Sequence, residues 1–110
     1  MAKLERRING DFNTLLSRIE NGILGGSVSA SLEDSSYFTS GESRCAVRVF
    51  ERYSYMGGNR VSLSVTLFQE RQGAPIFLSA ITSGGSQAMF FKINTFGEEA
   101  FLQKLNELIE

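Results

Sequence analysis

The stretch Gly84-Gly85-Ser86 has the residue types of a loop that binds phosphate. If a helix began at Ser86, its free N–H groups would face an anion. A P-loop also requires Lys-Ser or Lys-Thr after its glycines, and neither pair occurs in the chain. Two apolar, strand-forming runs, Ile76–Ser83 and Ser86–Ile93, flank the glycines, and two residues is the commonest length of a hairpin loop. The sequence therefore favours a turn, with the anion nest as the alternative.

A second group of residues that could bind a ligand comes from two stretches, 44–53 and 60–70, which alternate with the period of a strand. In the first, we expect Cys45, Val47 and Val49 to face the core and the intervening positions to face away. Arginine forks bind carboxylate or phosphate, aromatic rings stack, and small hydroxyls leave room for a ligand. The predicted binding face consists of Arg44, Arg48, Phe50, Arg52, Ser62, Ser64, Thr66 and Phe68.

This face has two other interpretations. It could be an ordinary solvated sheet surface, or two copies could pack through Phe50 and Phe68, because exposed aromatic rings favour self-association. We predict a homodimer, with a small molecule or another protein as further partners. We expect no nucleic-acid binding, because the net charge is -1 and acidic residues lie among the arginines.

The absence of histidine restricts the chemistry open to this chain. Histidine is the usual general base and the commonest metal ligand, so Ser-His and Cys-His nucleophile systems are excluded. The single cysteine, Cys45, is expected to be a small buried residue, and one cysteine cannot supply a zinc site. No motif pairs two carboxylates for acid–base catalysis. We therefore predict a non-enzymatic protein with no cofactor and no metal.

Hydrophobic spacing predicts two amphipathic helices, one near each end of the chain. Asp11 stands at the N-cap position of the first helix, and Gly22 and Gly25-Gly26 are expected to supply the positive φ that ends it. The second helix begins with the capping-box pattern of residues 95–98. The apolar stripes are Phe12, Leu15, Leu16, Ile19 and Ile23 in the first helix, and Phe101, Leu105, Leu108 and Ile109 in the second.

Alternation with a period of two predicts the strands. They cover residues 3–8, 27–33, 44–53, 60–70, 76–83 and 86–93, and the polar run Asp34–Ser43 is predicted to be a loop. The order is then β-α-β-β-β-β-β-α, an α+β fold in which short connections make the sheet antiparallel. No linker divides the chain, so residues 1–110 are expected to form one domain. Both helices should pack on the sheet, as in a helix-grip fold or on a flatter sheet.

An apolar cavity between the sheet and the second helix is the alternative ligand site. It would be lined by Phe77, Ile81, Met89, Phe91, Phe101 and Leu105. The same residues would also suit an ordinary core. A small molecule would bind there, rather than on the sheet surface.

The sequence pattern predicts a cytoplasmic protein. Charged residues occupy the first stretch, "MAKLERRINGDF", where a secretory signal requires apolar residues, and no apolar run is long enough to span a membrane. The single cysteine agrees, because small secreted domains usually carry an even set of cysteines.

Two stretches resemble the signature segments of an uncharacterised family of short bacterial proteins of unknown function. They are "RCAVRVFERYSYMGGNRVSLSVTLF", which begins at Arg44, and "FLSAITSGGSQAMFFKINTFGEEAFL", which begins at Phe77. The resemblance implies a bacterial, cytoplasmic, single-domain protein of about this length. It brings no assigned activity, cofactor or catalytic residue.

Overall fold

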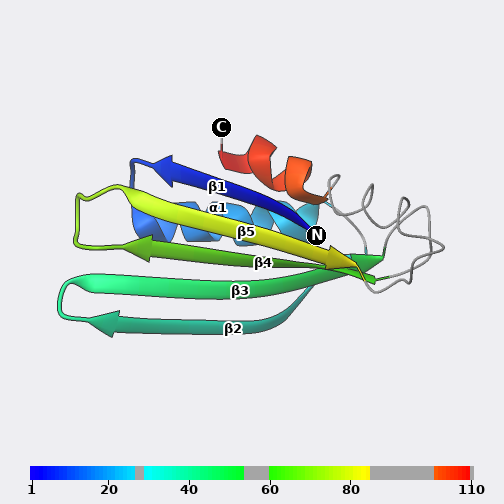
Figure 1. Ribbon diagram of the computed structural model, residues 1–110, viewed down its shortest axis with the longest axis horizontal. Helices are drawn as coiled ribbons and strands as arrows, with labels where there is room; N and C mark the ends of the chain where they lie inside the picture. Colours follow the sequence, from blue (N-terminus) through cyan, green and yellow to red (C-terminus); the bar gives the residue numbers. More distant parts are fainter. Residues whose placement is uncertain (27–28, 54–59, 85–100, 110) are drawn as a thin grey trace.

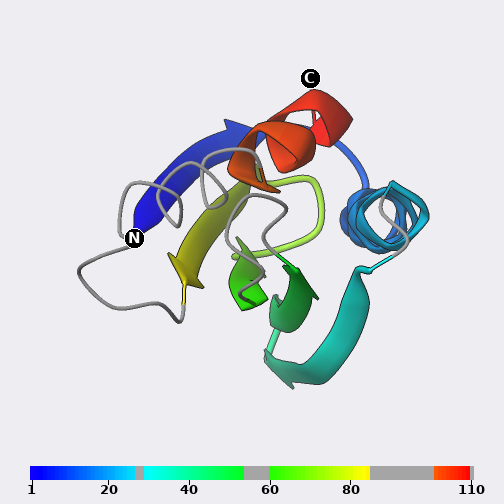
Figure 2. The same ribbon diagram turned by 90° about the vertical axis from the view of Figure 1, so that its right-hand side faces the viewer.

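The fold is α+β, with one antiparallel sheet whose helices lie on the same side of it (Figure 1 and Figure 2). The computed structural model describes residues 1–26, 29–53, 60–84 and 101–109. The elements are β1 (Ala2–Ile8), α1 (Phe12–Gly25), β2 (Ser31–Ser40), β3 (Ser43–Tyr53), β4 (Arg60–Gln69), β5 (Ile76–Gly84) and a C-terminal helix over residues 101–109. The five strands lie in the order β1-β5-β4-β3-β2 and every neighbouring pair is antiparallel. The predicted α+β class and antiparallel sheet are confirmed.

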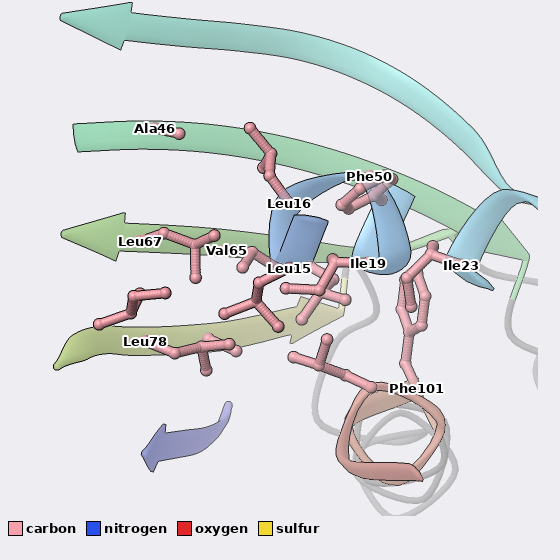
Figure 3. Packing of buried hydrophobic residues seen from close by; sticks show 14 of the residues in the cluster. Leu15, Leu16, Ile19, Ile23, Ala46, Phe50, Val65, Leu67, Leu78 and Phe101 are labelled. Atoms are coloured by element: carbon pink, nitrogen blue, oxygen red, sulfur yellow. The ribbon is translucent and has the colours of Figure 1, made fainter. Parts of the chain in front are cut away.

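The core lies between the sheet and the two helices (Figure 3). The predicted stripe of α1 is buried, and the buried positions of β4 and β5 alternate with positions that point away from the helices. Phe101 and Leu105 bring the C-terminal helix into the same cluster. The sheet side of the core consists of Ala46, Phe50, Val61, Leu63, Val65, Leu67, Ile76, Leu78 and Ala80. The predicted apolar face of residues 60–70, formed by Val61, Leu63, Val65 and Leu67, is therefore confirmed, and the strand ends at Gln69.

The start of α1 agrees with the sequence in detail. Gly10 has a φ of 141° and turns the chain after β1. The Asp11 side chain accepts a hydrogen bond from the Thr14 backbone N–H at 2.9 Å and another from the Thr14 hydroxyl at 2.9 Å. One of the N–H groups that a helix start leaves without a helical partner is thereby satisfied, which confirms the predicted N-cap.

Removing this cap should give a stability loss that depends on pH. The hydrogen bonds from Thr14 lower the pKa of Asp11 below its ordinary value of 3.8. A lowered carboxyl pKa stabilises the fold above the unfolded-state pKa, and this contribution is lost as pH falls through the folded-state pKa. Asp11→Ala should therefore lower the melting temperature by roughly 5 °C at neutral pH and by less at about pH 3.

Asp11→Asn is the matched control for this prediction, because asparagine caps a helix about as well as aspartate and does not titrate. Its melting temperature should stay close to that of the wild type at neutral pH. Melting curves recorded by circular dichroism across this pH range provide the measurement. An Asp11→Ala deficit that does not shrink toward acid pH would contradict the assigned cap.

The end of α1 differs from the prediction. The glycines with positive φ are Gly10, Gly41 and Gly73 among the described residues, and the C-cap Gly26 has a right-handed φ of -89°. Gly22 lies within the helix, where a Cβ atom would stand 2.3 Å from Cδ2 of Leu108. Its small size therefore lets α1 and the C-terminal helix approach closely.

The second strand also lies elsewhere than predicted. We predicted a strand over residues 27–33 and a loop over Asp34–Ser43, but β2 begins at Ser31 and continues to Ser40. The predicted loop is wrong because β2 is an edge strand with nearly every side chain exposed, so its sequence carries no apolar alternation. The chain instead turns at Gly41, which has a φ of 59°. Residues 27 and 28 lie outside the described ranges.

The predicted orientation of β3 is reversed in the structure. Ala46 and Phe50 are fully buried against the helices, whereas Cys45, Val47 and Val49 point to the other side and are partly exposed. Both sets of positions in this strand mix apolar with polar residues, so alternation alone does not fix its orientation. The orientation of β3 is decided by Phe50, which pairs with Leu63 of β4 and packs in the core.

Several predictions fall partly or wholly outside the described residues. These are the strand over residues 86–93, the capping box of residues 95–98 and the turn or anion nest, of which only Gly84 is described, as the last residue of β5. In the C-terminal helix, Phe101 and Leu105 are buried and Leu108 and Ile109 are partly buried, so the predicted apolar stripe is confirmed.

Candidate functional site

The sheet has one face against the helices and one face that no described element covers (Figure 2). Strand register places the side chains of the second face, which we name the open face, in rows that run across the sheet. The first row is Arg7, Phe77, Phe68, Cys45 and Phe38; the second is Glu5, Ser79, Thr66, Val47 and Ser36; the third is Lys3, Ile81, Ser64, Val49 and Asp34. Ser83, Ser62 and Glu51 form a shorter fourth row.

The first row makes the open face aromatic. Phe38 is 58% exposed, Phe77 44% and Phe68 40%, and Ile81 two rows away is 42% exposed. Thr66, Phe68, Phe77 and neighbouring residues of β1 and β5 line a shallow apolar hollow of about 320 Å³. Large apolar side chains that are singly exposed are common, but three phenylalanines in one row and an isoleucine two rows away form a patch on the same face.

Charged residues lie at the two edges of the open face. The β1 edge carries Lys3 and Arg7 beside Glu5, and the Arg7 guanidinium lies 5.1 Å from the centre of the Phe77 ring. The β2 edge carries Asp34. Between the edges the polar side chains are small, and the Ser62 and Ser83 hydroxyls are hydrogen-bonded at 2.7 Å. The face therefore has aromatic rings along its first row, small hydroxyl and aliphatic side chains in its middle, a more basic edge at β1 and an acidic edge at β2.

Four of the eight residues predicted to form the binding face lie on the open face, namely Ser62, Ser64, Thr66 and Phe68. The other four, Arg44, Arg48, Phe50 and Arg52, lie on the helix side, so the expectation that all eight share one face is wrong. The cause is the reversed orientation of β3. Phe50 is 0% exposed and is not available for the predicted packing of two copies, whereas Phe68 is.

The three arginines of β3 connect the sheet to the helices. The Arg44 guanidinium lies 4.6 Å from the centre of the Phe12 ring, and its Nε donates to Oε1 of the buried Gln69 at 3.1 Å. Gln69 in turn donates to the Ala74 carbonyl at 2.9 Å. Arg48 forms an ion pair with Glu20 of α1.

Arg52 makes the corresponding contact with the C-terminal helix. Its guanidinium lies 4.4 Å from the centre of the Phe101 ring, and burial lowers its pKa. The aliphatic stems of Arg44, Arg48 and Arg52 cover apolar core residues. The guanidinium groups of Arg44 and Arg52 stack on aromatic rings, and that of Arg48 pairs with a carboxylate. This row of arginines therefore links the sheet to both helices. The sequence pattern had predicted ligand binding for these residues.

The cavity predicted between the sheet and the C-terminal helix does not form from the residues assigned to it. Phe77 and Ile81 point to the open face, whereas Phe101 and Leu105 lie in the core on the opposite side of the sheet. Met89 and Phe91 lie outside the described residues. The four described residues cannot line one cavity because the sheet separates them.

In the described ranges, no three acidic or thiol side chains form a group that could hold a metal ion. Within the same ranges, no helix has both the length and the apolar character needed to cross a bilayer. Gly84 ends β5, and the other two residues of the predicted anion nest, Gly85 and Ser86, are not described.

Most residues of the open face were not among those predicted from the sequence. They are Lys3, Glu5, Arg7, Asp34, Ser36, Phe38, Cys45, Val47, Val49, Glu51, Phe77, Ser79, Ile81 and Ser83. Strand alternation does place Phe77 and Ile81 on the side opposite Ile76 and Leu78, a signal that could have found them. Phe38 could not be found in this way, because its strand has no apolar alternation.

The fold and this surface define a small α+β protein whose antiparallel sheet has one face that no described element covers, with exposed aromatic rings along its first row. The chain belongs to DUF6054, a family of unknown function, whose family model matches residues 1–110. The resemblance to an uncharacterised family is thereby confirmed. No protein with a curated description matches the sequence.

Proposed function

We propose that this protein is a non-enzymatic interaction domain that binds a partner through the open face. One observation carries the proposal: Phe38, Phe68 and Phe77 in the first row and Ile81 in the third row of one sheet face are 40–58% exposed. Folded chains rarely leave such a patch in water, and patches of this kind typically mark interaction sites. The side chains of Ser79, Thr66 and Ser64 in the second and third rows are small, so a partner surface can approach the sheet closely there.

The polar residues support binding rather than catalysis. Histidine is absent, and the acidic side chains of the open face, Glu5, Asp34 and Glu51, belong to three different strands. The half-buried arginines that could attract an anionic substrate are engaged with Glu20 and with the Phe12 and Phe101 rings on the other side of the sheet. The open face instead offers apolar area, which is what a protein surface contributes to an interface core.

Site-specific photocrosslinking in the native cells tests this proposal. A photoreactive amino acid at Thr66, in the middle of the open face, should give a defined covalent adduct on irradiation, either with a second copy or with another protein. Ser17, exposed on α1, is the matched control position and should give none. Equal yields of adduct at the two positions, or no adduct at Thr66, would refute an interaction through the open face.

A further inference from the structure

The charges on the open face complement one another when two copies of the face are brought together. Lys3 on β1 and Asp34 on β2 belong to the same row, at opposite edges of the sheet, with β4 midway between them. A two-fold axis that runs between two facing sheets, parallel to β4, brings β1 of one copy over β2 of the other. Lys3 then meets Asp34 of the second copy, and the symmetry produces this contact twice.

We infer that the partner of the open face is a second copy of this chain, related by this two-fold axis; the inference rests on the function proposed above. In the first row, the same two-fold rotation places Phe68 against Phe68 of the second copy and Phe77 against Cys45 of the second copy. It also places Arg7 against Phe38, next to the hollow lined by Phe68 and Phe77. Phe38, the most exposed aromatic ring of the face, then contacts the Arg7 cation of the other copy and lies next to the apolar hollow.

The charges also distinguish this arrangement from the other two-fold that would face the sheets. An axis perpendicular to the strands would place β1 over β1, and Lys3 of one copy would then meet Arg7 of the other. Like charges in contact disfavour an interface, whereas Lys3 against Asp34 favours it. The axis parallel to β4 is therefore favoured by the contacts between the rows of side chains and by the pairing of opposite charges.

The size of the face is sufficient for a specific dimer. Five strands spaced about 4.8 Å apart, each about eight residues long with a rise of about 3.3 Å per residue, give on the order of 600 Å² per copy. Two such faces bury roughly 1,200 Å², the lower end of the range for stable specific interfaces. Sheets pack face to face with their strands nearly aligned, which this axis preserves.

A charge-reversal experiment in the ultracentrifuge tests the arrangement. Lys3→Asp and Asp34→Lys each place like charges in both edge contacts, so each variant alone should dissociate at least tenfold more readily than the wild type. An equimolar mixture of the two variants should form a heterodimer, because every edge contact then joins opposite charges. The double variant, with both changes in one chain, should dimerise like the wild type. Glu70→Lys, in the exposed turn before β5, is the control and should leave the dimer unchanged.

The outcomes separate this inference from the proposed function. A wild type that stays monomeric at high concentration would overturn the second copy as partner, while the Thr66 adduct still decides whether the face binds another protein. If Phe68→Asp dissociates the dimer but charge reversal does not affect it, the proposed two-fold axis is wrong and the open face is still the interaction surface. A dimer that Phe68→Asp leaves unchanged would overturn self-association through the open face, while the Thr66 adduct again decides whether the face binds another protein. Both charge positions are exposed, and melting curves of each variant verify that it folds.

Discussion

Replacing Phe50 with serine is expected to lower the free energy of unfolding by about 3–5 kcal/mol. Phe50 is 0% exposed and packs in the core between β3, β4 and the helices. Its loss leaves a large cavity, and the serine hydroxyl would stand in apolar surroundings. Small domains have total stabilities of about 5–15 kcal/mol, so the substitution removes a large part of the free energy of unfolding. Urea unfolding followed by circular dichroism measures this free energy for the variant and the wild type.

Val49→Ser is the matched control, because it changes the neighbouring residue on the opposite face of the same strand. Val49 is partly exposed on the open face, and its replacement should cost no more than about 1 kcal/mol. Both variants should be compared in dilute protein, since association adds stability of its own. If Val49→Ser proved the more damaging change, β3 would have the orientation that its sequence alternation first indicated.

The structure bears out those parts of the sequence analysis that depended on an unambiguous pattern. The stripe of α1 has apolar residues at helical spacing and polar residues elsewhere, so a single orientation buries it. The same holds for β4, where Val61, Leu63, Val65 and Leu67 alternate with small polar residues. Asp11 was found because N-capping is a local interaction that the sequence itself encodes.

The site was harder to predict because it depends on contacts between elements distant in sequence. In β3, arginines alternate with valines, and treating arginine as exposed reversed the strand. Arginine is amphipathic, so a partner such as Glu20 or the Phe101 ring allows its stem to lie on the core side. These partners are about thirty to fifty residues away in the sequence, and only the assembled fold brings them to the strand.

Replacing Arg48 with methionine is expected to destabilise the fold by about 2 kcal/mol, although methionine retains most of the apolar stem. The Arg48–Glu20 ion pair joins β3 to α1, with 14% and 28% of the two side chains exposed. Arg48 also donates to the backbone carbonyls of Val47 at 3.0 Å and Ser36 at 3.2 Å. The variant leaves the Glu20 carboxylate in a half-buried position without its cation, which is the main cost.

Arg71→Met is the matched control, because Arg71 and Glu70 form an ion pair with 60% and 68% of their side chains exposed. Solvent screens such a pair, and its loss should change stability by less than about 0.5 kcal/mol. A double-mutant cycle of Arg48→Met with Glu20→Gln isolates the interaction energy of the buried pair. A coupling energy near zero would mean that Arg48 stabilises the fold through its stem and backbone hydrogen bonds alone, and that the ion pair does not hold α1 on the sheet. A clear coupling would establish the arginine row of β3 as a structural link between the two layers, which leaves the open face as the surface on which binding must be sought.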